Sequence, residues 1–128
     1  MRVGDEVVGA IGPGLCAFVG VTHVDGEAEA RTLASKLWHL RILEGERSVA
    51  DTTREVLVVS QFTLYGDVSK GRRPSWLAAA RPEQAEPLVE AVVSALRDLG
   101  ATVATGRFRT EMLVALENDG PVTLLLET

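Results

Sequence analysis

The chain has 128 residues, of which 46% are hydrophobic and 24% are charged, so it has the size and composition of one globular domain spanning residues 1–128. Its formal net charge of −5 disfavours an extended contact with a nucleic-acid backbone, and we expect no DNA partner. No apolar run is long enough to cross a bilayer and no signal segment opens the chain, so we expect a cytoplasmic protein without a membrane partner.

The first half of the chain predicts two strands and a helix. Residues 6–11 form a short strand that ends at the turn Gly12-Pro13-Gly14. Residues 15–22 are nearly all apolar, which predicts a central strand covered on both faces. A helix follows, with Asp25 as its predicted N-cap. Its apolar positions have the spacing of one helical face: Ala30, Leu33, Ala34, Leu37 and Trp38.

The second half predicts a β-branched strand at residues 55–61, a functional loop at 62–81 and a second helix from Pro82, ended by Gly100. Residues 101–105, 111–117 and 122–127 complete the expected strands, the last two as a hairpin. This pattern predicts an α+β domain: a curved, largely antiparallel sheet or small barrel with two packed helices.

Conventional catalytic groups are scarce. Cys16 is the only cysteine and lies in an apolar run, which predicts a buried, inert thiol. His23 and His39 are the only histidines, and neither lies in a motif typical of a Ser-His-Asp triad. No closely spaced group of His, Asp, Glu and Cys predicts a metal site, and no glycine-rich loop precedes a helix. We therefore expect an enzyme, if it is one, to use neither a metal nor a nucleotide cofactor.

Two short segments stand out. Ser60-Gln61-Phe62-Thr63-Leu64 closes the buried strand with polar groups at its exit, and Asn118-Asp119-Gly120-Pro121-Val122-Thr123 joins the last two strands. Each has a plain structural interpretation when taken singly. Ser60 and Gln61 can satisfy backbone groups at a strand end, and Asn-Asp-Gly is a common turn.

Together these segments resemble the D-aminoacyl-tRNA deacylase family, which is marked by Ser-Gln-x-x-Leu and by Asn-x-Gly-Pro-Val/Phe-Thr near the C-terminus. The first pattern is met at Ser60, Gln61 and Leu64, and the second from Asn118 to Thr123. Residues 11–15, 71–75 and 105–108 are also similar to the family, and in its order. Members usually begin with a further strand, so we expect this chain to lack the family's first strand.

The resemblance implies a homodimer that hydrolyses the ester between a D-amino acid and the terminal adenosine at the 3′ end of tRNA, as a chiral proofreading step. Achiral glycine, mischarged on tRNA-Ala, would also be removed. In the family, a cis Gly-Pro peptide of one subunit reaches into the pocket of the other. Carried over, Gly120 and Pro121 are the chiral selector, and they form the substrate-binding set with Leu64, Asn118, Val122 and Thr123.

The resemblance also implies how the ester is cleaved. Backbone amides near Phe62 and Thr63 hold the oxyanion, and the 2′-hydroxyl of the substrate assists. Ser60 and Gln61 position the adenosine or the Thr63 loop. A second hypothesis makes Thr63 a covalent nucleophile, although an internal threonine without a neighbouring base is poorly activated.

Three basic residues within four positions, Lys70, Arg72 and Arg73, form a local patch that can hold tRNA phosphates; a solvated charged loop is the alternative. Two other functions remain open at this stage. One is a dimeric module that binds tRNA ends or an acylated ligand without cleaving it. The other is an esterase for a different acyl ester that uses Thr63.

Overall fold

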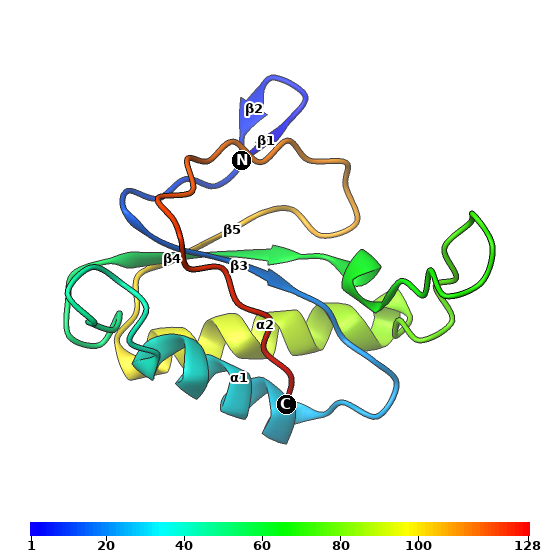
Figure 1. Ribbon diagram of the computed structural model, residues 1–128, viewed down its shortest axis with the longest axis horizontal. Helices are drawn as coiled ribbons and strands as arrows, with labels where there is room; N and C mark the ends of the chain where they lie inside the picture. Colours follow the sequence, from blue (N-terminus) through cyan, green and yellow to red (C-terminus); the bar gives the residue numbers. More distant parts are fainter.

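The computed structural model describes residues 1–128 and shows two helices packed on one face of a small sheet (Figure 1). An N-terminal hairpin and the first part of the chain after β5 lie on the side opposite the helices in this view, whereas the C-terminal end returns to the helix side and ends beside α1. Neither helix combines the length and the apolar character that crossing a membrane requires. The elements are β1 (Arg2–Val3), β2 (Glu6–Val7), β3 (Gly14–Val19), α1 (Glu27–His39), β4 (Glu55–Ser60), η1 (Phe62–Tyr65), α2 (Pro82–Leu99) and β5 (Val103–Thr105).

The sheet has three strands in the order β3-β4-β5, and both pairs are parallel. The α+β class with two helices is confirmed, but the expectation of a largely antiparallel sheet is wrong for these strands. The reason is the connections: α1 joins β3 to β4 and α2 joins β4 to β5, and a crossover through a helix returns the chain to the same end of the sheet. Only the β1-β2 hairpin is antiparallel.

The strand predicted to be central, β3, instead lies at one edge of the sheet, and β4 lies in the middle. Phe18 is 42% exposed and Cys16 is exposed as well, so the prediction of a buried thiol is wrong. An apolar run is compatible with a strand covered on both faces, but it does not reveal whether other parts of the chain cover those faces or pair with both edges. Partial burial still raises the pKa of the Cys16 thiol, with the N-terminal ammonium opposing the shift, so the thiol stays protonated at neutral pH.

The predicted strands at residues 111–117 and 122–127 are not strands in the single chain. Their one ladder contact joins Leu113 to Arg2, through two backbone hydrogen bonds of 2.8 and 2.9 Å. No other bridge pairs these segments with a strand, and several of their apolar side chains are exposed, among them Leu116, Leu124 and Leu125.

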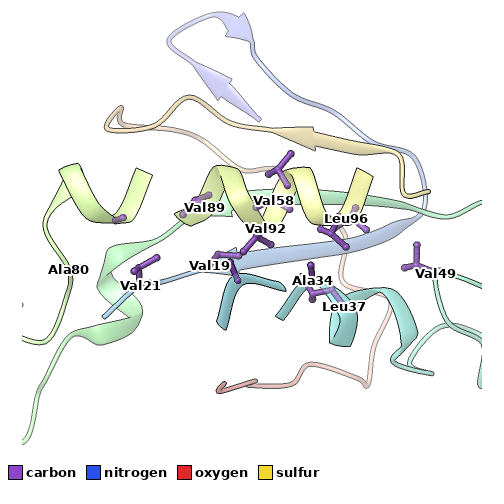
Figure 2. Close-up of a cluster of buried hydrophobic side chains, with 14 residues drawn as sticks. Val19, Val21, Ala34, Leu37, Val49, Val58, Ala80, Val89, Val92 and Leu96 are labelled. Carbon is purple, nitrogen blue, oxygen red and sulfur yellow. The ribbon is translucent and has the colours of Figure 1, made fainter. Parts of the chain in front are cut away.

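The core lies between the helices and the sheet (Figure 2). Ala34 and Leu37 of α1 and Val92 and Leu96 of α2 meet the sheet through Val58 and its neighbours. These positions repeat every three or four residues along each helix, which is why the predicted helical faces agree with the structure. The buried members are Val19, Val21, Ala30, Ala34, Leu37, Val49, Val56, Val58, Ala80, Ala85, Val89, Val92, Val93 and Leu96.

At the helix ends, the predicted C-terminal glycine of α2 is confirmed, whereas the predicted N-cap of α1 is wrong. Gly100 follows α2 with a φ of 110°, the left-handed conformation expected at a helix C-terminus. The predicted N-cap, Asp25, does not cap α1; its carboxylate accepts a hydrogen bond from the Thr22 amide at 2.9 Å. Gly26 precedes the helix instead, and its amide donates to the Glu29 carboxylate at 2.9 Å. That bond lowers the pKa of Glu29.

Replacing Leu96 by alanine should destabilise the domain by about 3 kcal/mol, because Leu96 is fully buried between α2 and the sheet and its loss leaves a cavity. Leu99→Ala is the matched control on the same helix, since Leu99 is 41% exposed, and it should cost less than about 1 kcal/mol. Urea unfolding of both variants gives the comparison. Equal losses would show that Leu96 is not part of the cooperative core.

Candidate functional site

Ser60 is the last residue of β4 and lines a cavity of about 510 Å³. One wall is α2, and the other is the chain that leaves β5, including Gly106 and Phe108. The cavity therefore brings the first sequence motif next to residues 105–108, one of the other segments that resembles the family.

Immediately after β4 the chain is held in place by the sheet. The Gln61 amide donates to the Val19 carbonyl at 2.8 Å, which extends the β3-β4 ladder by one residue. The Gln61 side-chain amide then donates to the Thr63 hydroxyl. The side chains of Gln61 and Thr63 are therefore in contact directly after the strand exit.

Phe62 and Thr63 begin the 3₁₀ helix η1, and their amide N–H groups donate to no acceptor in the chain. The first N–H groups of any helix have no intrahelical partner. Here both donors lie at the exit of a buried strand, in two residues that are exposed. A pair of neighbouring, unpaired amides in a fixed turn can hold an anionic oxygen.

The Thr63 hydroxyl has no base beside it. Its hydrogen-bond partner is the Gln61 carboxamide, which accepts no proton near neutral pH. His23 Nε2 contacts the Leu77 carbonyl at 2.6 Å and His39 Nδ1 the Ser35 carbonyl at 3.0 Å, so each ring is engaged elsewhere. Burial first, and the carboxylates of Asp25 and Glu127 second, raise the pKa of the nearby Tyr65 phenol, which is therefore protonated at neutral pH.

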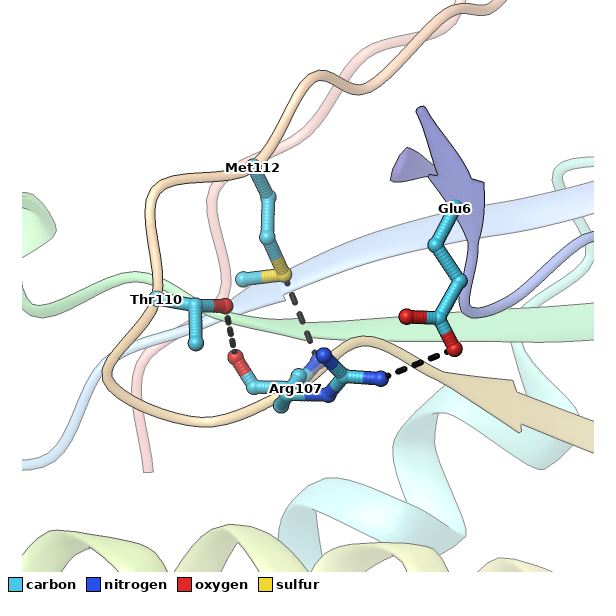
Figure 3. A network of polar contacts seen from close by, with 4 residues as sticks. All are labelled: Glu6, Arg107, Thr110 and Met112. Atoms are coloured by element: carbon cyan, nitrogen blue, oxygen red, sulfur yellow. Dashed lines mark hydrogen bonds and ion pairs between the residues drawn. The ribbon is translucent and has the colours of Figure 1, made fainter. Parts of the chain in front are cut away.

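The far wall of the cavity is built by a small polar network on the segment after β5 (Figure 3). The Arg107 guanidinium lies 3.2 Å from the Glu6 carboxylate of β2, and the Arg107 amide donates to the Met112 sulfur at 3.3 Å. The Thr110 hydroxyl donates to the Arg107 carbonyl at 2.7 Å. These contacts hold the loop that carries Phe108 at the cavity. Sequence analysis did not select Phe108 or Met112 as site residues.

The second motif forms an exposed turn. The Gly120 amide donates to the Asn118 carbonyl at 2.9 Å, and the Asn118 side-chain amide donates to the Thr123 hydroxyl at 3.1 Å. The Gly120–Pro121 peptide is cis. Nothing lies within 4 Å of the position that a Gly120 Cβ would occupy, and Val122 is 44% exposed.

The single chain does not bring the two motifs together. In Figure 1, η1 lies on the right of the view, whereas the orange-red chain that carries residues 118–123 runs on the left. No hydrogen bond joins the two segments. Leu64, assigned to the substrate-binding set, stays with the first motif in η1 and is 48% exposed.

The predicted basic patch lies on a hairpin-like loop after η1. Asp67 and Ser75 pair through two backbone hydrogen bonds of 2.8 Å and close the loop at its base. Lys70, Arg72 and Arg73 are exposed at its tip, and none of them has a carboxylate partner in the chain. The structure contains no group of three or more His, Cys, Asp and Glu side chains placed to hold a metal ion.

Comparison with known proteins decides the family. The model of the family described as D-Tyr-tRNA(Tyr) deacylase matches residues 1–127. The chain belongs to this family. A relative named D-aminoacyl-tRNA deacylase from Nocardia farcinica is 66% identical over 131 residues, which cover 100% of this chain and 92% of the relative. One of the same name from Thermobifida fusca is 64% identical over 128 residues, 99% of this chain and 91% of the relative.

Two solved structures are similar to this family member. One, titled c-Myc DNA Unwinding Element Binding Protein, has a TM-score of 0.92 and 37% identity, and the match covers 99% of this chain and 90% of that one. The other, titled as a probable eukaryotic D-amino acid tRNA deacylase, has a TM-score of 0.71 and 16% identity, with 83% and 80% covered. At that identity the second likeness concerns the fold alone.

Replacing Thr123 by valine should loosen the 118–123 turn, because valine keeps the shape of threonine but cannot accept the hydrogen bond from Asn118. A lost hydrogen bond of about 1 kcal/mol corresponds to an amide exchange about fivefold faster at Gly120. Hydrogen exchange followed by NMR measures this. Val122→Ala removes a neighbouring exposed side chain without a polar contact and should leave the rate unchanged. Unchanged exchange in Thr123→Val would show that this bond does not brace the turn.

Proposed function

We propose that this D-aminoacyl-tRNA deacylase cleaves the ester at the Phe62 and Thr63 amides, in a pocket that a second copy of the chain completes. The bond cleaved joins a D-amino acid to the terminal adenosine of tRNA, and glycine charged on tRNA-Ala is a further substrate. The observation that carries the proposal is the pair of unpaired amides at the exit of β4, within a motif of the matched family. The enzyme works in the cytoplasm, where tRNAs are aminoacylated.

The chemistry needs little from side chains. Water attacks the ester carbonyl, the negative charge that forms on its oxygen is held by the Phe62 and Thr63 amides, and the ribose oxygen leaves. The 2′-hydroxyl of the substrate assists the attack. Fixed N–H donors cost no reorganisation when charge develops, which is why a pre-formed turn is effective here. Neither a metal nor a nucleotide cofactor takes part.

Ser60, Gln61 and Thr63 position the reacting group. Gln61 is tied to β3 through its backbone and to Thr63 through its side chain, so it transmits the rigidity of the sheet to η1. Ser60 lines the cavity next to this turn and contacts the adenosine. Thr63 acts through its backbone, because its hydroxyl has only a carboxamide beside it.

Chirality is selected by the 118–123 turn of the second copy. Gly120 and Pro121 enter the pocket of the partner and occupy the space that an L side chain would need, with Asn118, Val122 and Thr123 supporting them. Two features support this arrangement: the turn is exposed, and it lies apart from η1 of its own chain. A wall that clashes with one enantiomer discriminates more strongly than a pocket that only prefers a shape.

A homodimer would also explain why apolar side chains of residues 122–125 are exposed in the single chain. Val122, Leu124 and Leu125 are 44%, 57% and 75% exposed, and Val122 and Leu124 have the two-residue spacing of one strand face. Pairing with a second copy would bury these apolar groups and supply the antiparallel strands that the sequence predicts.

Thr63→Val should keep the hydrolysis of D-tyrosyl-tRNA within about tenfold of the wild-type rate, because the amide of residue 63 is unchanged. Loss of a covalent nucleophile would instead lower kcat by a factor on the order of 10⁵ or more. Single-turnover release of D-tyrosine distinguishes the two results, and the larger loss would make Thr63 the nucleophile.

Phe62→Pro tests the amide directly, since proline removes one N–H and little else from the backbone. Residue 62 opens η1 and follows an extended Gln61 (φ −144°, ψ 85°), so a proline is tolerated there. Phe62→Ala is the matched control for the lost ring. The proline variant should be slower than the alanine variant by about 10²–10³-fold, the usual cost of one oxyanion donor. Equal rates would exclude this amide.

Gly120→Ala should leave the folded chain intact but lower the rate on D-tyrosyl-tRNA at least about tenfold. The added methyl group meets open space in the single chain, so the melting temperature should not change. In a shared pocket it would enter space that the substrate needs. Full activity in this variant would remove the turn from the site.

Mixing subunits decides whether the site is shared. A one-to-one mixture of Phe62→Pro and Gly120→Ala chains, refolded together, contains mixed dimers with one intact pocket each. It should recover about a quarter of wild-type activity, because half of the dimers are mixed and each has one of two sites. No recovery would place both motifs in one chain's pocket.

A further inference from the structure

The loop between η1 and α2 has a charge opposite to that of the whole protein. From Val68 to Pro82 the chain has no acidic residue and four basic ones, although the net charge is −5. Asp67, at the base of this loop, accepts a hydrogen bond from the Ser69 amide at 2.9 Å, and hydrogen bonding by the Ser69 side chain first and by this amide second lowers the pKa of Asp67. The tip beyond it therefore presents only positive charge.

An exposed aromatic pair links η1 to the base of this loop: Phe62 belongs to η1, and Trp76 directly follows Ser75, which closes the loop with Asp67. The rings of Phe62 and Trp76 meet edge to face, with centroids 5.4 Å apart and planes at 70°. Phe62 is 53% exposed and Trp76 is 44% exposed. Two half-exposed rings in contact with each other form a contiguous apolar patch, and such a patch beside a reaction site is typical of a binding surface.

The indole is held rigidly even though it is exposed. It packs directly on Gly66, where a Cβ atom would lie 2.5 Å from the Trp76 ring. The residues that follow Trp76 are hydrogen-bonded to the segment that follows β3. The Thr22 hydroxyl donates to the Ala78 carbonyl at 2.5 Å, and the Ala80 amide donates to the Val21 carbonyl at 2.8 Å. A ring fixed in this way loses little entropy on binding.

We propose that Trp76 stacks against the nucleobase that precedes the terminal adenosine in the single-stranded 3′ end of tRNA. Lys70, Arg72 and Arg73 hold the phosphates on the 5′ side of that base. The inference rests on the proposed function, because it takes the ester to be cleaved at Phe62 and Thr63. It adds a base-stacking residue and a direction in which the RNA leaves the site.

The order of groups along the surface gives this direction. The order starts at the oxyanion donors of η1, where the Phe62 ring also lies. The Trp76 ring contacts the Phe62 ring, and the basic tip lies beyond the Asp67–Ser75 pair that precedes Trp76. A single-stranded RNA presents the same order: the ester, the terminal base, the next base and then further phosphates. Aromatic stacking with basic side chains alongside is the usual way in which proteins hold single strands.

The kinetic test compares two substrates. D-tyrosyl-tRNA carries the whole 3′ end, whereas 3′-D-tyrosyl-adenosine lacks the preceding base and its phosphates. Trp76→Ala should lower kcat/KM for the tRNA by between about 5- and 150-fold, the range for one stacked base, and leave that for the adenosine ester unchanged. Trp76→Phe should restore most of the loss. Leu77→Ala is the matched control, because Leu77 is 87% exposed and has no stacking surface.

Salt dependence tests the basic tip. Changing Arg72 and Arg73 together to glutamine should reduce the slope of log KM for tRNA against log salt concentration by about 1.4, or about 0.7 for each phosphate contact with a single strand. Arg31→Gln, on the exposed surface of α1, should not change the slope. An unchanged slope in the double variant would overturn the assignment of the tip.

A binding readout separates this inference from the proposed function. In a Trp38→Phe background Trp76 is the only tryptophan, so its fluorescence reports on stacking. Deacylated tRNA should quench it, and the same tRNA without its last three nucleotides should not. Equal losses of kcat/KM on both substrates in Trp76→Ala, or no quenching by intact tRNA, would overturn the inference. Quenching without hydrolysis by the wild-type chain would overturn the proposed function alone.

Discussion

The burial of β4 between two other strands is the constraint on which the rest of the structure depends. Val56, Val58 and Val59 are at most 2% exposed, because the two helices cover one face of the strand and a small cluster with Met1 covers the other. A strand paired on both edges and covered on both faces cannot shift its register without exposing its whole apolar face. Its exit, where Ser60 and Gln61 lie, is thereby fixed in space. The 3₁₀ helix η1 begins directly after this exit, so its start is held in place although η1 has no buried residues.

Local patterns were sufficient for the parts of the fold that depend on a single segment. The two helices follow from the repeat of their apolar positions, and the end of α2 follows from Gly100, since a left-handed residue is needed there. Pairing between distant segments was not predictable in the same way. Residues 15–22 are apolar enough for a central strand, yet β3 lies at an edge, because composition does not reveal which neighbours a strand has. The C-terminal segments were predicted to be strands, but in one chain they form only a single bridge, between Leu113 and Arg2.

The candidate site likewise has a part that was predictable from one contiguous segment and a part that depends on contacts between distant segments. Ser60, Gln61, Phe62 and Thr63 are contiguous, so their motif was sufficient to place them together, and the structure adds only that two amides are unpaired. The residues that sequence analysis missed lie far away in the chain. Phe108 and Met112 reach the cavity because β5 returns beside β4, and Trp76 reaches Phe62 because its loop folds back. Residues that are fourteen or fifty positions apart produce no periodic pattern in the sequence, so their contact cannot be predicted from local spacing.

Charge distribution decides how a protein with a net charge of −5 can act on RNA at all. At physiological ionic strength, fields are screened over about 8 Å, so a local group of cations acts almost independently of the distant carboxylates. The rest of the acidic surface repels phosphates that come close to it. A long duplex laid across the domain would meet that repulsion, whereas a single strand entering by its end can be held by the basic loop and the aromatic rings. In the proposed arrangement, the acidic surface and the small basic loop together favour binding of the end of an RNA over binding along its length.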